Sequence, residues 1–588
     1  MTEWTKNLTA RLGDTDFFPK SKPKKSDDDN ELGEATTSAS VAGGGHSARR
    51  TGITENQLTV SNALRSFLVE KNVLNELEAG VDDSGTPAPL QALVDKPHII
   101  VPAELTDRSH PLPEYFISSS HNTYLMAHQL YGTSSAVAYE TALSAGSRCV
   151  EIDAWDNDEN PDEPKVTHGY TLVSNISFRS VCETIRDIYD KEAAESVDRQ
   201  GYRAAPIILS LENHCGQDGQ RRLAQIMMEV WGDRLLSKAV REEGHEEQDG
   251  GEHVLLEELG SKILVIVEHH IPGEVSDSDP DDSSDEETDE QQAVKAYNEM
   301  KKASPAATIV PELAELGVYA QSVKPSDNSW YDPGKLTNGP HHHLINVSES
   351  GLSADMAIPG ASAKIGAHNA HHLMRVFPKG TRISSKNLNP VAYWGIGAQI
   401  CALNWQTFGA GMQLNEALFS GSDGYLLKPA ALRHGGSGKL STGVQKKLSL
   451  HIAGASQIPV PGDADPEEIR PYVTCMLTHP DHPHKPPPKR KTAPYKQHKL
   501  GLFHRGAKSP PTDPIWDETL EWEYEDNELV FLRILIKSDD SFAANPVLAV
   551  AAVRISYAVR DWRFIRMLDL KGRETKCSLL VKFQVEDA

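Results

Sequence analysis

The stretch Cys149-Val-Glu-Ile-Asp-Ala154 alternates apolar residues with two carboxylates, and this period of two is typical of a β-strand with one polar face. Similar strand patterns occur on both sides of it, at Tyr115–Ser119, Pro206–Leu211 and Lys262–Val267. Helical patterns separate these strands, at Tyr139–Ala145, Phe178–Tyr189 and Arg221–Val230. Strands that alternate with helices along the chain predict an α/β unit with parallel strands.

This α/β pattern is interrupted and then resumes. Glu274–Glu290 carries ten acidic residues and no basic one, a composition that cannot bury a core, so we expect a flexible acidic linker over residues 271–308. Strand patterns return near Leu344–Val347, Gln399–Leu403 and Gly424–Leu427. The sequence therefore predicts one α/β unit split into two halves, at residues 111–270 and 309–435.

Different patterns flank the split unit. Residues 1–55 are of low complexity and predict a disordered tail, and residues 56–110 contain the apolar spacing of a short helical region. Residues 445–588 have the strand lengths and spacing of an all-β sandwich. Their strand patterns lie at Leu448–Ile452, Tyr472–Leu477, Thr519–Tyr524, Val530–Ile536, Leu548–Ile555 and Leu579–Phe583.

The 588 residues carry a formal net charge of −25 at pH 7. A field of this sign disfavours nucleic acid as a partner and repels anionic membranes on average, so any contact with phosphates must be local. One local candidate for membrane docking is His482–Thr512, which has eight basic residues and no acidic one. Six scattered cysteines and the lack of a long apolar run favour a cytoplasmic protein that binds membranes peripherally.

Polar groups gather at the ends of the predicted strands, where the mouth of a parallel barrel would form. Some offer hard oxygen ligands, which suit Ca²⁺ or Mg²⁺ rather than Zn²⁺, and such an ion would lower the pKa of a substrate hydroxyl. The histidines titrate near neutral pH and could protonate a leaving oxygen, so the whole set indicates phosphoryl transfer. Its members are His121, Asn122, Glu151, Asp153, His168, Glu212, Ser348 and Arg375.

Three further groups of histidines, His269-His270, His341-His-His343 and His371-His372, lack the accompanying ligand spacing of a metal site. We interpret them as loop or surface histidines rather than as a zinc site. A single histidine or glutamate at a strand end is likewise usually a solvated or capped group. The functional argument therefore depends on the number of such groups that come together from separate segments.

Eight motifs together resemble eukaryotic phosphoinositide-specific phospholipase C. Those similar to the X half of that family are Ser118–Leu125, Arg148–Asp156, His168–Thr171 and Leu209–His214. Those similar to its Y half are Asn346–Glu349, Arg375–Pro378, Ala402–Thr407 and Gly424–Pro429. The resemblance covers roughly residues 112–435. It implies a split (βα)₈ TIM-type barrel followed by a C2-like sandwich, in a small form without an evident pleckstrin domain.

The resemblance also implies an activity, namely hydrolysis of phosphatidylinositol and its phosphates to diacylglycerol and inositol phosphate through a cyclic 1,2-phosphodiester. His121 and His168 would be the catalytic pair, and Glu151 would take the proton from the inositol 2-hydroxyl. Ca²⁺ would be the cofactor, and its ligands would be Asn122, Glu151, Asp153 and Glu212. The headgroup would be held by Ser348, Arg375 and Phe377, on an anionic phosphoinositide membrane surface; the resemblance does not identify an activator protein.

One departure from the family bears on substrate choice. Two lysines that contact the 4- and 5-phosphates in animal enzymes are replaced here by Ile266 and Glu268. A carboxylate repels a phosphate, so we expect weakened discrimination for the bisphosphate, unless another basic group substitutes. Two alternative functions stay open from the sequence: a glycerophosphodiester phosphodiesterase, and a catalytically silent lipid-binding scaffold.

Overall fold

A computed structural model provides the coordinates of this chain. It describes residues 57–588 with these gaps: 82, 84, 127–133, 169–173, 199–203, 242–252, 271–307, 325–329, 333–335, 337–338, 380–381, 383–385, 461, 463–464, 483–484, 497–508 and 540–546. The predicted tail at residues 1–55, the predicted acidic linker apart from its last residue, and part of the basic segment 482–512 therefore lie outside the described residues.

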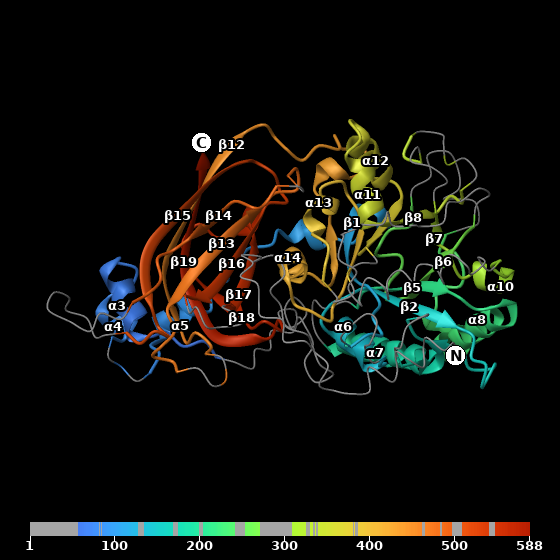
Figure 1. Ribbon diagram of the computed structural model, residues 1–588, viewed down its shortest axis with the longest axis horizontal. Coiled ribbons are helices and arrows are strands. Elements are labelled where there is room, and N and C mark those ends of the chain that lie inside the picture. The colour runs from blue at the N-terminus through green and yellow to red at the C-terminus, as the bar shows by residue number, and fades with distance from the viewer. Residues whose placement is uncertain are drawn as a thin grey trace, which may run out of the picture.

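Parallel strands form a closed barrel in the middle of the chain (Figure 1). Each strand pairs with the next along the barrel, and the pairing of Ser119 with Cys149 closes the ring between β1 and β2. The strands are short runs that are buried on both faces, as is usual for parallel sheets covered by helices. They are β1 (Tyr115–Ser120), β2 (Cys149–Trp155), β5 (Ile207–Asn213), β6 (Ile263–Glu268), β7 (Gln321–Val323), β8 (His343–Ser348), β9 (Leu373–Phe377) and β10 (Ile400–Leu403).

Short antiparallel strands extend this sheet at two places, and helices cover the barrel from outside. The extensions are β3 (Lys165–Val166), β4 (Ile176–Ser177) and β11 (Tyr425–Leu427). The helices of the first half are α6 (Val137–Ser144), α7 (Phe178–Asp198), α8 (Gln217–Trp231) and α10 (Pro311–Ala314). Those of the second half are α11 (Glu349–Met356), α12 (Ala361–Asn369), α13 (Pro390–Trp394) and α14 (Ala410–Phe419).

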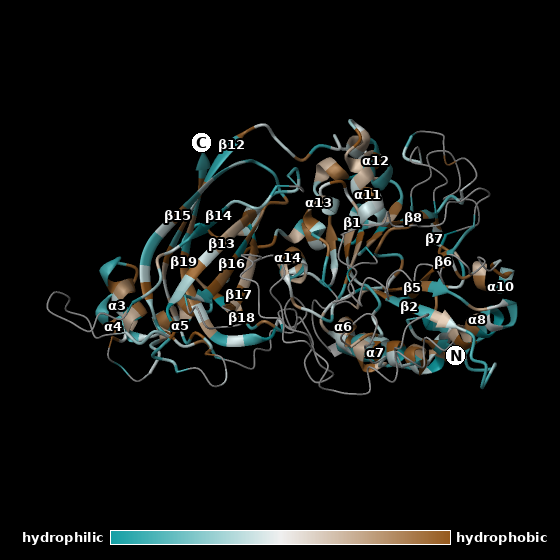
Figure 2. Cartoon of the chain, viewed as in Figure 1, coloured by the Kyte–Doolittle hydropathy of each residue, from teal (hydrophilic) through white to brown (hydrophobic). Residues whose placement is uncertain are grey.

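Amphipathic sequence explains how these helices pack. In α8 the residues Leu223, Met227 and Trp231 recur every fourth position and are buried against the sheet. They join one core with Val150 and Ile152 of β2. In Figure 2 the central strands of the sandwich, such as β16 and β17, are largely hydrophobic, whereas α8 shows hydrophilic residues at the edge of the barrel. The first barrel half thus has its own apolar core outside the sheet, and a second core covers the other half.

The C-terminal strands form an antiparallel sheet that divides into two four-stranded halves. The order is β14-β13-β16-β17-β18-β19-β12-β15, and β17 and β18 share a single paired position, Val550 with Leu568. One apolar core contains residues of both halves, so the halves pack face to face as a sandwich. The strands are β12 (Gln445–Ser456), β13 (Pro471–Thr478), β14 (Lys489–Lys491), β15 (Ile515–Glu525), β16 (Phe531–Ser538), β17 (Val547–Arg554), β18 (Trp562–Leu568) and β19 (Glu574–Asp587).

The second barrel half and the sandwich share buried contacts. The ring of Trp394 in α13 lies 5.8 Å from that of Phe531 in β16, and both belong to one apolar core. Within this interface, the buried Arg533 Nε donates to Gln413 Oε1 of α14 at 3.0 Å. A buried polar contact of this kind fixes one orientation of the two surfaces. The sandwich is therefore packed against the barrel, beside α14.

Three short helices precede the barrel in the chain but pack on the sandwich instead. They are α3 (Asn62–Glu70), α4 (Glu76–Ala79) and α5 (Ala88–Val94), and they lie at the far end of the sandwich in Figure 1. Leu64 and Phe67 of α3 share a core with Trp562 and Phe564 of β18. One-turn helices complete the described structure: η1 (Ala103–Thr106), η2 (Leu112–Glu114), η3 (Gly232–Arg234), η4 (Ala430–Leu432) and η5 (Ile555–Tyr557).

The predicted fold class, a split parallel barrel followed by an all-β unit, is confirmed. Two barrel strands, β7 and β9, have no counterpart among the predicted strands. Strand β7 has only three residues, and Arg375 interrupts the apolar run of β9. Periodicity over so few residues does not distinguish a strand from a loop.

A buried ion pair between Arg148, directly before β2, and Glu192 of α7 tests this architecture. Arg148 is fully buried and its Nη1 and Nη2 lie 2.8 and 3.0 Å from the two carboxylate oxygens of Glu192. We expect Glu192→Ala to lower the free energy of unfolding by about 3–5 kcal/mol, because it leaves a buried guanidinium without its counter-charge. The matched control is Asp187→Ala on the same helix. The exposed Asp187 carboxylate pairs with Arg186, so this substitution should lower the free energy of unfolding by no more than about 1 kcal/mol. Urea unfolding followed by circular dichroism measures both, and equal losses would contradict the assignment.

Candidate active site

The predicted functional residues lie at the carboxyl ends of the barrel strands. His121 and Asn122 follow β1 directly, and Glu151 and Asp153 share one face of β2. Asp153 is paired in register with Glu212 of the neighbouring strand β5. On the other half of the barrel, Asn346 is paired with Arg375 and Ser348 with Phe377. Since parallel strands end at the same rim, these side chains surround the mouth of the barrel.

The turn after β1 has an unusual backbone conformation. Asn122 has a positive φ of 45°, which asparagine tolerates better than most residues with a side chain. Its backbone N–H donates to Glu151 Oε2 at 2.8 Å, and its carbonyl accepts from Gln406 Nε2 at 3.0 Å. Bonds to both barrel halves thus fix the position from which the Asn122 side chain projects.

Tyr124 holds two of the predicted metal ligands together. Its hydroxyl donates to Asp153 Oδ2 at 2.6 Å and lies 3.1 Å from Asn122 Oδ1. Burial raises the pKa of Tyr124 well above its ordinary value, and the negative charge of Asp153 adds to this effect, so the hydroxyl keeps its proton. The amide oxygen of Asn122 and the carboxylate of Asp153 are therefore positioned by one shared donor.

A cluster of possible metal ligands lies beside this tyrosine. Among the described residues, Asp153, Glu212 and His214 bring one ligand atom each within 4.8 Å of one another. His214 Nε2 is 3.2 Å from Glu212 Oε1, and the His214 ring stacks on Trp155 at 4.1 Å. Carboxylate and amide oxygens are the donors that a hard divalent cation prefers, so Asn122, Asp153 and Glu212 fit such an ion. The sequence analysis did not name His214 as a candidate ligand, although it ends the motif Leu209–His214.

Glu151 connects the two halves of the barrel. Its Oε1 lies 2.6 Å from Arg375 Nη2 of β9, and both side chains are buried. Arg375 Nη1 also donates to Asn346 Oδ1 at 3.0 Å, while its buried Nε has no acceptor among the described residues. The structure therefore pairs Arg375, which was predicted to hold a phosphate, with the carboxylate predicted to act as the base.

His121 is held in one tautomer. Its Nδ1 lies 2.8 Å from Asn404 Oδ1, and the amide of Asn404 is oriented by donation from its Nδ2 to Lys386 O at 3.0 Å. Nδ1 therefore carries the proton, and Nε2 has the lone pair. Nε2 is 4.0 Å from Glu151 Oε2. Burial lowers the pKa of His121, and the charge of Glu151 acts in the opposite direction.

His168 reaches the same rim from a different segment. It follows Thr167, whose backbone N–H donates to Asp153 O at 3.3 Å, and β3 before it pairs with β2. Its side chain is partly exposed. The next residues, 169–173, lie outside the described residues. His168 is thus near the end of β2, on the same side of the barrel as the carboxylates.

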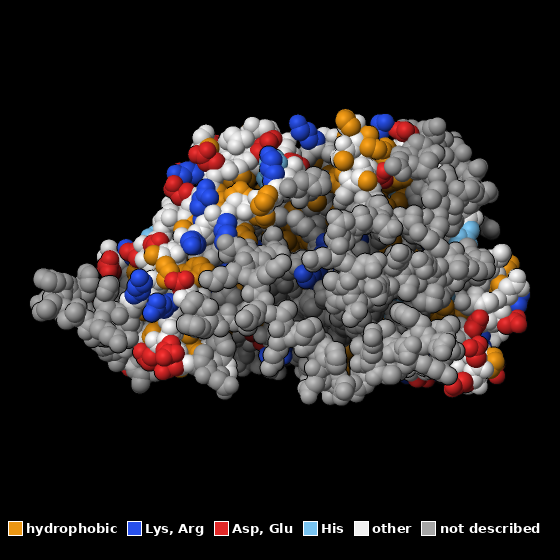
Figure 3. All heavy atoms as spheres, viewed as in Figure 1, with side chains coloured by type: hydrophobic (Ala, Val, Ile, Leu, Met, Phe, Trp, Pro, Cys, Tyr) orange, Lys and Arg blue, Asp and Glu red, His pale blue; other side chains and the backbone are white. Residues whose placement is uncertain are grey.

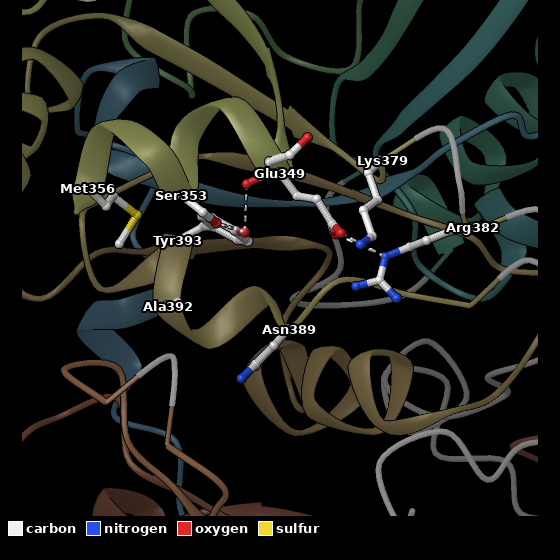
Figure 4. Close-up of a pocket in the computed structure, with 9 residues that line it drawn as sticks. Glu349, Ser353, Met356, Lys379, Arg382, Asn389, Ala392 and Tyr393 are labelled. Atoms are coloured by element: carbon white, nitrogen blue, oxygen red, sulfur yellow. Dashed lines mark hydrogen bonds and ion pairs between the residues drawn. The ribbon is translucent and has the colours of Figure 1, made fainter. Parts of the chain in front are cut away.

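The predicted headgroup residues lie in β8 and β9, next to a pocket that is lined by other residues. Ser348 Oγ accepts the Gly351 N–H at 3.2 Å and caps α11, and the Arg375 guanidinium lies 5.5 Å from the Phe377 ring. The adjacent pocket has a volume of about 350 Å³ (Figure 4). Arg382 Nε donates to Glu349 Oε1 of α11 at 2.9 Å, so these two residues of the lining form an ion pair. Other residues that line it are Ser350, Ser353, Met356, Lys379, Asn389, Ala392 and Tyr393.

Ile266 and Glu268, the residues at the positions of the two family lysines, lie in different surroundings. Ile266 is buried in the interior of the barrel. Glu268 ends β6 in register with Ser322 of β7, and Lys324 follows that strand. Burial raises the pKa of Glu268, Lys324 opposes this shift, and Glu212 reinforces it. The mouth therefore has the carboxylate of Glu268 where the family has a lysine. Lys324, which follows the neighbouring strand β7, acts electrostatically on this carboxylate.

The fold and the site define a parallel-barrel protein whose mouth combines histidines, carboxylates and an arginine. Two family profiles match the chain: "Phosphatidylinositol-specific phospholipase C, X domain" over residues 108–269, and the Y domain of the same description over residues 313–431. The chain belongs to the eukaryotic phosphoinositide-specific phospholipase C family. The resemblance inferred from the motifs is confirmed.

Several relatives show the same similarity. The chain is 32% identical over 499 residues to the Mus musculus 1-phosphatidylinositol 4,5-bisphosphate phosphodiesterase delta-3, covering 82% of this chain and 58% of the relative. It is 29% identical to the human delta-1 protein, covering 82% and 61%. The crystal structure of L. pealei PLC21 has a TM-score of 0.66 at 23% identity, covering 93% of this chain and 67% of PLC21. The chain thus spans about three fifths of the length of these delta relatives.

Proposed function

We propose that this protein is a phosphoinositide-specific phospholipase C, which hydrolyses phosphatidylinositol or its phosphates to diacylglycerol and inositol phosphate. The observation that carries this proposal is the geometry around His121. Asn404 orients its imidazole, and the free Nε2 faces Glu151 beside the cluster of Asp153 and Glu212. A general acid–base catalyst needs this combination of a fixed tautomer and a neighbouring anionic site.

In the first step, the inositol 2-hydroxyl gives its proton to Glu151, and its oxygen attacks the phosphorus. A cyclic 1,2-phosphodiester forms, and the bond to the diacylglycerol oxygen breaks. In their protonated, cationic form, His121 and His168 stabilise the developing negative charge and supply the proton to the leaving oxygen. Water then opens the ring to release inositol phosphate.

The cofactor proposed for these steps is Ca²⁺. Asn122, Glu151, Asp153 and Glu212 would hold it, and when bound it would make the 2-hydroxyl more acidic and neutralise charge on the phosphate. The residues described above fit this role because Tyr124 and the register of β2 with β5 bring their oxygens together.

The headgroup would be bound by Ser348, Arg375 and Phe377. Arg375 already pairs with Glu151, so a phosphate at this position would compete for the guanidinium. A bound headgroup would therefore release the Glu151 carboxylate from Arg375, so that Glu151 could accept a proton. The buried Nε of Arg375 offers a further donor for a phosphate oxygen.

Membrane contact is proposed through the C-terminal sandwich, which we interpret as a C2-like domain, and the protein would be cytoplasmic and peripheral. In β14 the side chains of Lys489, Arg490 and Lys491 are exposed. Basic side chains (blue) also lie among acidic ones over this part of the surface in Figure 3. Within the described part of the chain, no helix combines the length and apolarity required to span a bilayer.

Removal of the His121 imidazole tests the activity. We expect His121→Ala to reduce the release of water-soluble inositol phosphate from phosphoinositide vesicles by at least about 100-fold, because the proton-transfer group is lost. The control is His482→Ala at an exposed site of the sandwich. Both variants should keep the melting temperature and sediment with anionic vesicles as the wild type does.

Three outcomes of this experiment would contradict the proposal. Full activity of His121→Ala would exclude His121 as a catalytic residue. No release by the wild type in Ca²⁺ would favour the silent scaffold, although both histidines and all four predicted ligands are present. Release of glycerol phosphate from deacylated lipids, with phosphatidylinositol left intact, would favour a glycerophosphodiester phosphodiesterase.

The proposed metal site makes a second prediction. We expect Asp153→Asn and Glu212→Gln each to weaken Ca²⁺ binding at least about tenfold, because each removes an anionic oxygen ligand. His214→Ala should leave the affinity nearly unchanged, since Ca²⁺ disfavours nitrogen ligands. Isothermal titration calorimetry of the full chain measures the affinities. If the His214 variant alone loses affinity, the predicted ligand set is wrong.

Substrate choice makes a third prediction. We expect kcat/KM for phosphatidylinositol 4,5-bisphosphate to exceed that for phosphatidylinositol by less than about tenfold, since Glu268 stands where a lysine would pair with a phosphate. Glu268→Lys should raise this ratio, and Lys324→Ala should lower it. Initial rates on mixed micelles of phosphatidylinositol, its 4-phosphate and its 4,5-bisphosphate give the values. A large preference of the wild type for the bisphosphate would overturn the interpretation of Glu268.

A further inference from the structure

The pocket beside the predicted headgroup residues lies between two helices of the second barrel half. Its volume of about 350 Å³ falls within the range of small-molecule sites, about 300–1,000 Å³. The described residues that line it all lie outside the barrel strands, so the pocket is separate from the mouth itself. They come from α11, from the segment after β9, and from α13 with the residue before it: Glu349, Ser350, Ser353 and Met356; Lys379 and Arg382; Asn389, Ala392 and Tyr393.

Positive charge predominates among the described residues of the lining. Lys379 and Arg382 carry a positive charge each, and Glu349 carries the negative one. The Glu349 carboxylate is already engaged, because both of its oxygens accept from Arg382 Nε, at 2.9 and 3.0 Å. The lining therefore has a net positive charge, which favours an anion as the ligand.

The guanidinium of Arg382 keeps two nitrogens for a ligand. Only its Nε is hydrogen-bonded to a described residue, and the side chain is 21% exposed, so a solute can reach the two Nη atoms. In Figure 4 these two nitrogens point away from Glu349, towards the side of the pocket on which Asn389 lies. The planar fork of a guanidinium matches two oxygens of a phosphate. A phosphate has further oxygens for Lys379, whereas a carboxylate would use both of its oxygens on the fork.

The other side of the pocket is held in place by hydrogen bonds between the two helices (Figure 4). The hydroxyl of Tyr393 in α13 donates to Glu349 O of α11 at 3.2 Å, and Ser353 Oγ lies 3.0 Å from the same hydroxyl. Burial raises the pKa of Tyr393 to about 12, so the hydroxyl keeps the proton that this bond needs. Met356 and Ala392 add apolar surface on this side. The pocket thus suits a ligand with an anionic end for the two cations and a less polar part.

We propose that this pocket binds the phosphate group of a small phosphate ester, and that Lys379 and Arg382 hold the phosphate. The ester is either a phospholipid headgroup or a soluble molecule, since the recognition chemistry is the same. The pocket lies on the same side of the barrel as the mouth, because Glu349 directly follows β8 and Lys379 follows β9. Ser350 Oγ of the lining is 3.2 Å from Ser348 Oγ, so the bound phosphate would lie beside the proposed active site without occupying it. The inference does not depend on the proposed phospholipase activity.

A thiol placed in the pocket tests binding of a soluble phosphate ester to the full chain. The six native cysteines are all buried, so a thiol reagent should label Ser353→Cys selectively. The probe is sn-glycerol 3-phosphate at constant ionic strength, and we expect it to slow the labelling. Adding Lys379→Ala or Arg382→Gln should raise the concentration needed for this protection at least about tenfold, since each removes a charge-assisted bond. The control Lys364→Ala removes an exposed lysine of the same barrel half, which pairs with Asp332, and should keep the protection.

Vesicles test the lipid source of the phosphate. Sedimentation compares phosphatidylcholine vesicles with and without phosphatidic acid, and neither kind contains a phosphoinositide. If a headgroup fills the pocket, phosphatidic acid should increase the binding of the native chain and of Lys364→Ala. Lys379→Ala and Arg382→Gln should lose most of this increase. Lys379→Ala keeps the ion pair of Glu349 with Arg382, so its melting temperature should not change and its effect reports binding rather than folding.

The two experiments together decide between the sources. Protection by glycerol phosphate with equal vesicle binding by all proteins assigns the pocket to a soluble ester. Weaker vesicle binding by the two pocket variants, Lys379→Ala and Arg382→Gln, assigns it to a headgroup, with or without protection by the soluble ester. Absence of protection together with equal vesicle binding would overturn the proposal. Protection that both pocket variants retain in full, with equal vesicle binding, would overturn it as well, because the phosphate would then bind elsewhere.

Discussion

The buried pair of Glu151 and Arg375 is the interaction on which the mouth of the barrel depends. Glu151 belongs to the first half of the split barrel and Arg375 to the second, and their contact of 2.6 Å exists only when the barrel is closed. The backbone of Asn122 is bonded to the same carboxylate. Because both charges are buried in the closed barrel, removal of either partner would leave the other there without its counter-charge.

A second bond crosses the halves in the same way. Asn404 of the second half fixes the tautomer of His121 in the first half. The proposed catalytic histidine is thus oriented by a residue 283 positions away in the sequence. The site is consequently a property of the closed barrel and not of either half.

The sequence allowed a good prediction of the strands that carry the first half of the site. In β2 and β5 the apolar runs are long enough for their period to be recognised, and the carboxylates stand at fixed positions within them. The pairing of Glu151 with Arg375 could not be predicted, since it depends on how the barrel closes. The role of Asn404 was missed for the same reason, although its motif had been recognised. His343 of β8 and His368 of α12, whose Nε2 atoms lie 2.9 Å apart, meet through the packing of α12 on the barrel, which leaves no signal in local spacing.

The charges at the mouth also explain why a cation is expected there. Asp153, Glu212 and Glu268 lie at or near the carboxyl ends of three adjacent strands, β2, β5 and β6. The charge of Glu212 raises the pKa of Glu268, which is the effect of like charges held close together. Arg375 is already engaged by Glu151, so it does not offset the acids on the first half. A divalent ion among these oxygens would relieve the repulsion, so the same carboxylates suit the chemistry proposed for the mouth.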